Sequence, residues 1–156
     1  MDAKFINPFL IATQNVFKTM LSTQINLGKP SVKANNLTLG EVTGIMGFAG
    51  DKKGTFTISF SKECATYAYR AMIGEDVPTI NSDVVDAIGE LTNIISGQIR
   101  VELEKLGINL RASLPTVIVG QNVAINFITP LPVIALPFSF DDRGTVRQLF
   151  IDFSFE

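Results

Sequence analysis

The 156-residue sequence contains no histidine and a single cysteine, Cys64. Without histidine, the chain cannot use Ser-His or Cys-His nucleophilic catalysis, and it cannot form a phosphohistidine intermediate. A single cysteine excludes an intramolecular disulfide framework, and no cysteine–histidine set is available for zinc. Any chemistry must therefore use carboxylates, amides, hydroxyls, lysines or groups that a partner supplies.

Long runs of one charge are also missing, and so are long apolar runs near the N-terminus. Thirteen basic residues against fifteen acidic residues leave a formal charge of −2, without a basic run. Nucleic acid and anionic membranes are therefore poor candidates as partners. Charged and amide residues interrupt the segment from Met1 to Met20, which argues against a signal peptide or a membrane span. We expect a cytoplasmic protein.

Composition favours a folded protein over a disordered one, because apolar residues make up 46% of the chain and charged residues 18%. A chain of this length fits one domain with a sizeable core. The sequence contains no linker and no low-complexity segment. We therefore expect a single domain that spans residues 1–156.

Hydrophobic periodicity predicts three helices, from Pro8 to Leu27, Ser61 to Ile73 and Asn81 to Leu106. Their expected ends are Asn7 and Gly28, Ser61 and Gly74, and Asn81 or Ser82 and Gly107. Strands are expected from Asn35 to Ala49, Thr55 to Phe60, Thr116 to Val119, Val123 to Phe127, Val133 to Phe140 and Val146 to Phe155. The order α-β-β-α-α-β-β-β-β predicts an α+β fold with helices packed on an antiparallel or mixed β-sheet.

Glu90 and Asn93 form the most informative pair, in the run Asp86-Ala-Ile-Gly-Glu-Leu-Thr-Asn-Ile-Ile-Ser-Gly97. Three-residue spacing on a helix places this carboxylate and this carboxamide side by side. The expected buried stripe of the helix consists of Ile80, Val84, Ile88, Leu91, Ile95, Ile99 and Leu106. Its expected outward face carries Asp83, Asp86, Glu90, Asn93, Gly97 and Glu104.

A solvated helix face is the usual explanation of a Glu-x-x-Asn pattern, since four-residue patterns recur by chance. This helix differs because Gly89 and Gly97 lie close to Asn93, itself a poor helix former. Each interior glycine costs about 1 kcal/mol relative to alanine. Gly97 lies two turns beyond Glu90, where a missing side chain lets another surface come close. The combination predicts a docking surface with chemistry on it.

The run from Asp86 to Gln98 resembles the signature helix of the CheC/CheX/FliY chemotaxis phosphatases, whose core is Glu-x-x-Asn. Gly28-Lys29-Pro30 and the hairpin from Gly47 to Ser61 are similar to the CheX pattern, as are Leu106-Gly107 and Pro115-Thr116-Val117. CheC-type members carry two signature helices, whereas the helix expected from Pro8 to Leu27 contains no glutamate. The chain is therefore identified as a CheX-type member with one site, and such members are usually homodimers.

The resemblance implies hydrolysis of the phospho-aspartate of a CheY-like response regulator, and only Glu90 and Asn93 carry over as catalytic positions. Asn93 would orient the attacking water, because phosphoryl transfer depends on positioning and a carboxamide adds no charge. Glu90 would dock to the receiver's lysine. We expect Asp86, Gly89 and Gly97 to contact the receiver. The chain itself is expected to bind no cofactor, since the receiver brings its own Mg²⁺.

Two other functions compete with this one. A non-catalytic binding or scaffold module of the same fold would dock a receiver domain or a flagellar-switch partner without turnover. Retention of both Glu90 and Asn93 favours catalysis over that alternative. An unrelated metabolic enzyme is disfavoured because the sequence lacks histidine and any other polar cluster.

Cys64 and a set of glycines have structural explanations. Cys64 lies at an apolar position of a short helix, so we expect it to be unreactive. The glycines resemble a phosphate-binding loop but lack its Gly-Lys-Ser/Thr ending. We expect strand bends at these positions, which are Gly40, Gly44, Gly47 and Gly50.

Two basic residues and one apolar run can each be interpreted in two ways. Arg100 and Lys105 could touch an acidic receiver surface, but their charge also suits the C-terminus of a helix. The apolar run from Leu131 to Phe138 could lie at a protein interface or inside the domain. Its prolines favour an edge position in the sheet.

Overall fold

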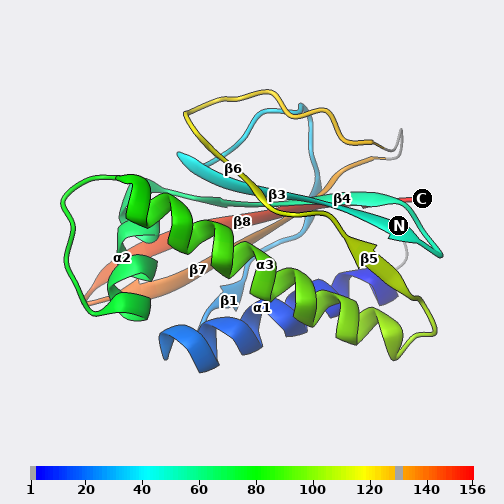
Figure 1. The fold of residues 1–156 in the computed structure, drawn as a ribbon, viewed down its shortest axis with the longest axis horizontal. Coiled ribbons are helices and arrows are strands. Elements are labelled where there is room, and N and C mark those ends of the chain that lie inside the picture. Colours follow the sequence, from blue (N-terminus) through cyan, green and yellow to red (C-terminus); the bar gives the residue numbers. More distant parts are fainter. Residues whose placement is uncertain (1–2, 129–131) are drawn as a thin grey trace.

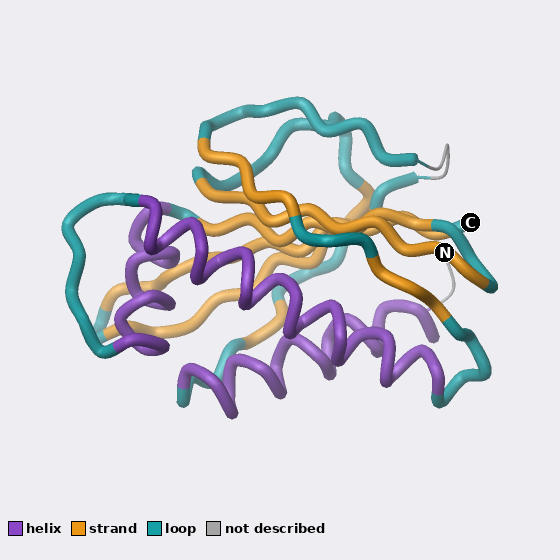
Figure 2. The backbone as a smooth tube through the Cα atoms, in the orientation of Figure 1, coloured by secondary structure: helices purple, strands orange, loops and turns teal. Residues whose placement is uncertain are grey.

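A computed structural model describes residues 3–128 and 132–156 of the chain. Its helices gather on one face of a β-sheet, and loops arch over the opposite face (Figures 1 and 2). The helices are η1 (Ala3–Phe5, a 3₁₀ helix), α1 (Ile6–Leu21), α2 (Lys62–Ile73) and α3 (Ser82–Glu104). The strands are β1 (Asn26–Leu27), β2 (Ser31–Val32), β3 (Val42–Gly50), β4 (Gly54–Phe60), β5 (Leu110–Ala112), β6 (Thr116–Val119), β7 (Ile134–Asp142) and β8 (Thr145–Phe155).

The eight strands of the described chain form one sheet, in which every pairing is antiparallel. Their order is β1-β7-β8-β4-β3-β5, with β2 also paired to β7 and β6 also paired to β3. Strands β4 and β8 therefore lie at the centre, whereas β5 and β6 form the edge beside α3. The predicted α+β fold and its element order are confirmed, and the sheet is antiparallel rather than mixed.

The sheet face beneath the helices forms an apolar core. Phe9 of α1 stacks on Phe153 of β8, with ring centroids 3.9 Å apart. Ile58 and Ile151 lie opposite each other in the central strand pair, and both are fully buried. Burial of each such side chain contributes about 1.5–3 kcal/mol, so this core holds α1 and α3 firmly on the sheet.

The opposite face of the central strands is polar but also buried. Thr57 of β4 and Asp152 of β8 face each other there under the loops. Lys33, which follows β2, donates to the Asp152 carboxylate at 2.7 Å and to the Leu37 carbonyl at 2.6 Å. Burial raises the pKa of the Asp152 carboxyl, and Lys33 acts in the opposite direction. A buried ion pair thus joins the loop after β2 to the centre of the sheet.

The first helix is shorter than the sequence indicates. It ends at Leu21 rather than Leu27, because Ser22 adopts a left-handed conformation with a φ of 50°. The segment Asn26–Leu27 leaves the helix and pairs with β7 as strand β1. The strand partner of Asn26–Leu27 lies far away in sequence, so the local helical periodicity could not indicate this pairing.

Within the described residues, no helix has both the length and the apolar character that a membrane span requires.

The helix caps are largely as predicted. Ser61 and Asn81 each accept a hydrogen bond from the backbone N–H three residues later, at 3.1 Å and 3.0 Å. Gly74 ends α2 in the left-handed region, with a φ of 89°. The prediction for α1 is wrong at its start: Phe5 rather than Asn7 is the N-cap residue, and it makes no side-chain cap. The reason is that η1 leads directly into α1.

Two strand predictions are corrected. The expected strand 123–127 does not form, since Ala124 makes only an isolated bridge to Leu37 between two loops. The first long strand begins at Val42 rather than Asn35. The short strands β1, β2 and β5 lack the length for a readable alternation and were therefore not predicted.

Strand β7 lies inside the sheet rather than at its edge, because β8 pairs on one side and β1 and β2 on the other. Leu131, the first residue of the apolar run that ends at Phe138, lies outside the described residues. Pro137 lies in the gap between the short partners, where its carbonyl accepts from the Gly28 N–H at 2.7 Å. In an antiparallel ladder the N–H and C=O of one residue point the same way. The missing proline N–H would therefore also point toward Gly28, just beyond the end of β1, so neither short strand loses a hydrogen bond between its paired residues.

Candidate functional site

Helix α3 presents the candidate pair on its solvent side. Most of the predicted buried stripe is buried as expected: Val84, Ile88, Leu91, Ile95 and Ile99. The prediction of burial is wrong at both ends of the stripe, since Ile80 is half-buried and Leu106 is 48% exposed. The reason at the C-terminal end is that α3 stops at Glu104 rather than Leu106. The predicted outward residues are exposed apart from Gly97, which is half-buried.

Glu90 and Asn93 lie one turn apart in α3, and both side chains are exposed. Neither the carboxylate nor the carboxamide makes a hydrogen bond or ion pair with any described residue. They border an open hollow of about 570 Å³, whose opposite wall is Pro115 and Val117 of the β6 segment. A carboxylate and an amide with all their bonding capacity free can bind a partner's polar groups or a water molecule.

Gly44 of β3 explains how α3 comes so close to the sheet. A Cβ atom at Gly44 would overlap the hydroxyl and methyl groups of Thr92, which lies between Glu90 and Asn93 in α3. Thr92 is fully buried and donates to the Ile88 carbonyl at 2.7 Å. The contact therefore positions the turn of α3 that carries the pair. Sequence reasoning missed this role of Gly44 and Thr92.

Gly89 makes a second close contact, with the edge strand. A Cβ atom there would lie 3.3 Å from the Cγ2 atom of Val117. The missing side chain thus allows β6 to approach α3 and to form the wall of the hollow. A receiver-contacting role for Gly89 stays a prediction, and internal packing already accounts for glycine at this position.

Asp86 and Gly97 lie on either side of the pair along α3. Asp86 is exposed and borders the hollow, one turn before Glu90. A Cβ atom at Gly97 would meet only Arg100 Nη2, at 4.0 Å, so no neighbour in the described chain requires glycine there. Partner contact by these two residues stays a prediction.

Cys64 and Lys105 do not contribute to this site. Cys64 is fully buried, and that burial raises the pKa of its thiol, so a thiolate nucleophile is disfavoured. Lys105 pairs with Glu102 at 2.9 Å. The described residues contain no group of three or more acidic or cysteine side chains that could hold a metal ion.

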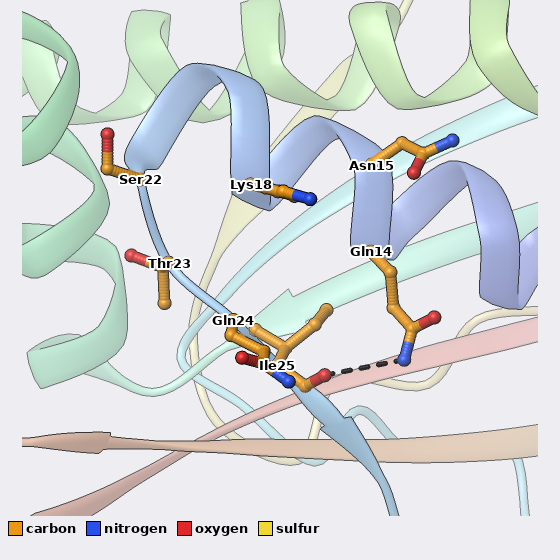
Figure 3. Close-up of a pocket in the computed structure, with 7 residues that line it drawn as sticks. All are labelled: Gln14, Asn15, Lys18, Ser22, Thr23, Gln24 and Ile25. Atoms are coloured by element: carbon orange, nitrogen blue, oxygen red, sulfur yellow. Dashed lines mark hydrogen bonds between the residues drawn. The ribbon is translucent and has the colours of Figure 1, made fainter.

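A second hollow, of about 490 Å³, lies between the last turns of α1 and the segment that follows it (Figure 3). Its lining is polar but contains no carboxylate, and Lys18 is its charged residue. Some of its polar groups are used internally: Gln14 donates to the Ile25 carbonyl at 3.4 Å, and Thr23 hydrogen-bonds Tyr67 at 2.6 Å. The hollow beside Glu90 and Asn93 is therefore the stronger candidate for chemistry.

The family model for chemotaxis phosphatase CheX matches residues 42–139, well over half of the chain. This chain belongs to that family. Membership makes it a phosphatase of the CheX type and confirms the resemblance that the run from Asp86 to Gln98 suggested. The matched range contains Glu90, Asn93 and both walls of the hollow.

Individual CheX proteins agree with the family match along nearly the whole chain. A chemotaxis protein CheX from Desulfovibrio desulfuricans is 38% identical, with a TM-score of 0.87 over 97% of this chain and 99% of the other. The CheY-P phosphatase CheX of Thermotoga maritima is 28% identical over 137 residues, which are 85% of this chain and 88% of that protein. The CheX–CheY–BeF₃–Mg²⁺ complex from Borrelia burgdorferi contains a chain that is 25% identical, with a TM-score of 0.81 over 97% of each chain.

Proposed function

We propose that this protein hydrolyses the phospho-aspartate of a CheY-like response regulator at Glu90 and Asn93. The observation that carries the proposal is the free, outward-facing pair on α3, in a CheX-family chain. Two relatives support the choice of substrate. One is named a CheY-P phosphatase, and another is solved in complex with CheY, BeF₃ and Mg²⁺.

Asn93 orients the attacking water in this proposal. An aspartyl phosphate is an acyl phosphate and already reactive, so the phosphatase needs mainly to place a water in line with the phosphorus. The water oxygen bonds to phosphorus as the bond to the aspartate oxygen breaks. The products are inorganic phosphate and the free aspartate carboxylate. A carboxamide can accept from the water and donate to the phosphoryl group without adding negative charge.

Glu90 acts as a docking residue and pairs with the receiver's lysine. A carboxylate with no internal partner is suited to that role, because nothing in the described chain must be displaced when the lysine arrives. A free carboxylate beside a dianionic phosphoryl group would otherwise be repelled. The Mg²⁺ ion that balances the phosphoryl charge belongs to the receiver, and this chain binds no cofactor of its own.

Substitution of Asn93 by alanine tests the catalytic role. We expect Asn93→Ala to lower kcat about 10²-fold, the effect of losing one positioned polar group, with KM for the phosphorylated receiver nearly unchanged. Gln98→Ala is the matched control, because Gln98 is an exposed amide on α3 that does not border the hollow. It should behave like the unmodified protein. An unchanged kcat in Asn93→Ala would refute the water-orienting role.

Glu90→Ala should raise KM for the phosphorylated receiver as well as lower kcat, because it removes the docking carboxylate. Binding of a receiver without any turnover by the unmodified protein would favour the non-catalytic docking module instead.

Homodimer formation and a cytoplasmic location are further parts of the proposal. Light scattering of the purified chain measures the first directly.

A further inference from the structure

Arg100 lies on the same side of α3 as the candidate site. Glu90, Asn93, Gly97 and Arg100 are spaced by three, four and three residues, which places them along one helix face. At 1.5 Å per residue, Arg100 is about 10 Å along the helix from Asn93. It borders a separate hollow of about 300 Å³ formed by the last turns of α3 and the segment leading into β5.

The guanidinium of Arg100 has no counter-charge among the residues that the structure describes. Its Nε atom is buried without a hydrogen-bond partner, and the side chain makes no ion pair with any described residue. Glu104 lies one turn later and borders the same hollow, yet it does not pair with Arg100. The Nη2 atom instead points back over Gly97, 4.0 Å from where a Cβ atom would stand.

Several other basic side chains of the described chain have acidic partners. Lys33 pairs with Asp152 at 2.7 Å, and Lys105 pairs with Glu102 at 2.9 Å. A half-buried arginine with an unsatisfied Nε is costly, since buried polar groups are normally hydrogen-bonded. The two Nη atoms are not among the buried atoms and have no hydrogen-bond partner in the described chain, so they are available to an external acceptor.

We propose that Arg100 binds an acidic side chain on the surface of the phosphorylated receiver and so forms a second anchor point beside the catalytic pair. This inference rests on the proposed function, because it takes the receiver as the partner. Arginine suits the role, since its planar guanidinium can bind a carboxylate through two hydrogen bonds.

The charges along α3 then dictate the orientation of the docked receiver. Asp86 and Glu90 are acidic at one end of the face, whereas Arg100, which is nearer to the catalytic pair than the acidic Glu104, is basic at the other. A receiver with a lysine near its phospho-aspartate and an acidic side chain farther away matches this pattern in one direction only. Reversed docking brings like charges together, which is unfavourable. Arg100 is thus a determinant of receiver specificity.

Binding of a CheY-type receiver loaded with BeF₃ and Mg²⁺ tests the proposal without requiring turnover. We expect Arg100→Gln to raise Kd about tenfold and Arg100→Lys to raise it less, because lysine keeps the charge but not the paired hydrogen bonds. In the phosphatase assay, Arg100→Gln should raise KM and leave kcat within about twofold, since the group does not touch the reacting atoms. Asn93→Ala should instead lower kcat and leave KM nearly unchanged.

Substitution on the receiver provides the complementary test, with this chain unchanged. Replacing the exposed acidic residues of the receiver one at a time by amides should identify one that raises Kd to the same extent. When the same receiver variant binds the Arg100→Gln protein, Kd should rise no further than it does for Arg100→Gln with the unchanged receiver. A Kd for Arg100→Gln within about twofold of the unmodified protein, together with no such residue on the receiver, overturns the proposal. Absence of turnover with intact BeF₃-receiver binding would overturn the phosphatase function and leave this test valid.

Discussion

Substitution of Gly44 by alanine should displace the helix that carries the site. The added Cβ atom would lie 2.9 Å from the Cβ atom of Thr92 and would overlap its hydroxyl group. Carbon atoms in contact are about 3.5–4.0 Å apart, so Thr92 and the turn around it must withdraw by about 1 Å. Thr92 is fully buried in α3 between Glu90 and Asn93, and rotation of its side chain would break the hydrogen bond of its hydroxyl to the Ile88 carbonyl.

Two effects of this displacement can be measured. Overpacking of this kind costs about 1–3 kcal/mol in the free energy of unfolding. A misplacement of about 1 Å at a catalytic group can lower the rate about 10²-fold. We therefore expect Gly44→Ala to reduce stability in urea unfolding and to lower kcat for dephosphorylation of the receiver by a larger factor than KM changes.

Gly47→Ala is the matched control for this experiment. Gly47 lies in the same strand, but a Cβ atom there would meet nothing closer than 3.8 Å. The double variant Gly44→Ala with Thr92→Gly removes the overlapping atoms, so its cost should be smaller than the sum of the single changes. The reasoning is refuted if Gly44→Ala is as stable and as active as Gly47→Ala.

The remaining predictions concern groups outside the site. Lys33→Met should cost about 3–5 kcal/mol of unfolding free energy, because it leaves the buried Asp152 carboxylate unpaired, whereas Lys29→Met at an exposed position should cost little. Burial already raises the Asp152 pKa, and loss of Lys33 raises it further, so the deficit should grow as pH rises through that pKa. Urea unfolding at mildly acidic and mildly alkaline pH measures this, and a deficit that shrinks as pH rises would contradict it. Cys64 should resist thiol reagents in the folded protein and react after unfolding in urea, because its thiol is buried with a raised pKa; rapid labelling of the native protein would contradict its burial.

Local signals in the sequence predicted most of the helices and the central strands. The caps Ser61 and Asn81 act through backbone groups only three residues away, so the sequence alone can indicate them. The end of α1 depends instead on pairing between Asn26–Leu27 and β7, more than a hundred residues later. The tolerance of Pro137 inside the sheet depends on the gap between β1 and β2. No local pattern carries that information.

The candidate site also combines features that the local sequence predicts with features that depend on residues far apart in the chain. Helical spacing alone predicted that Glu90 and Asn93 share an outward face, and the structure places both on the exposed side of α3. The contact between Gly44 and Thr92 joins residues from distant parts of the chain, so it required the folded structure. The same holds for Val117 as the opposite wall of the hollow, although the family resemblance already included the segment around it.

The most direct test of the central claim is the decay of a phosphorylated CheY-type receiver in Mg²⁺, measured alone and with the receiver in large molar excess over this protein. Hydrolysis at Glu90 and Asn93 predicts faster decay, with many phosphate ions released per chain, and loss of that acceleration in Asn93→Ala. Decay that matches the receiver alone, with every receiver from the same organism, would contradict the phosphatase function and leave receiver docking as the role of this surface.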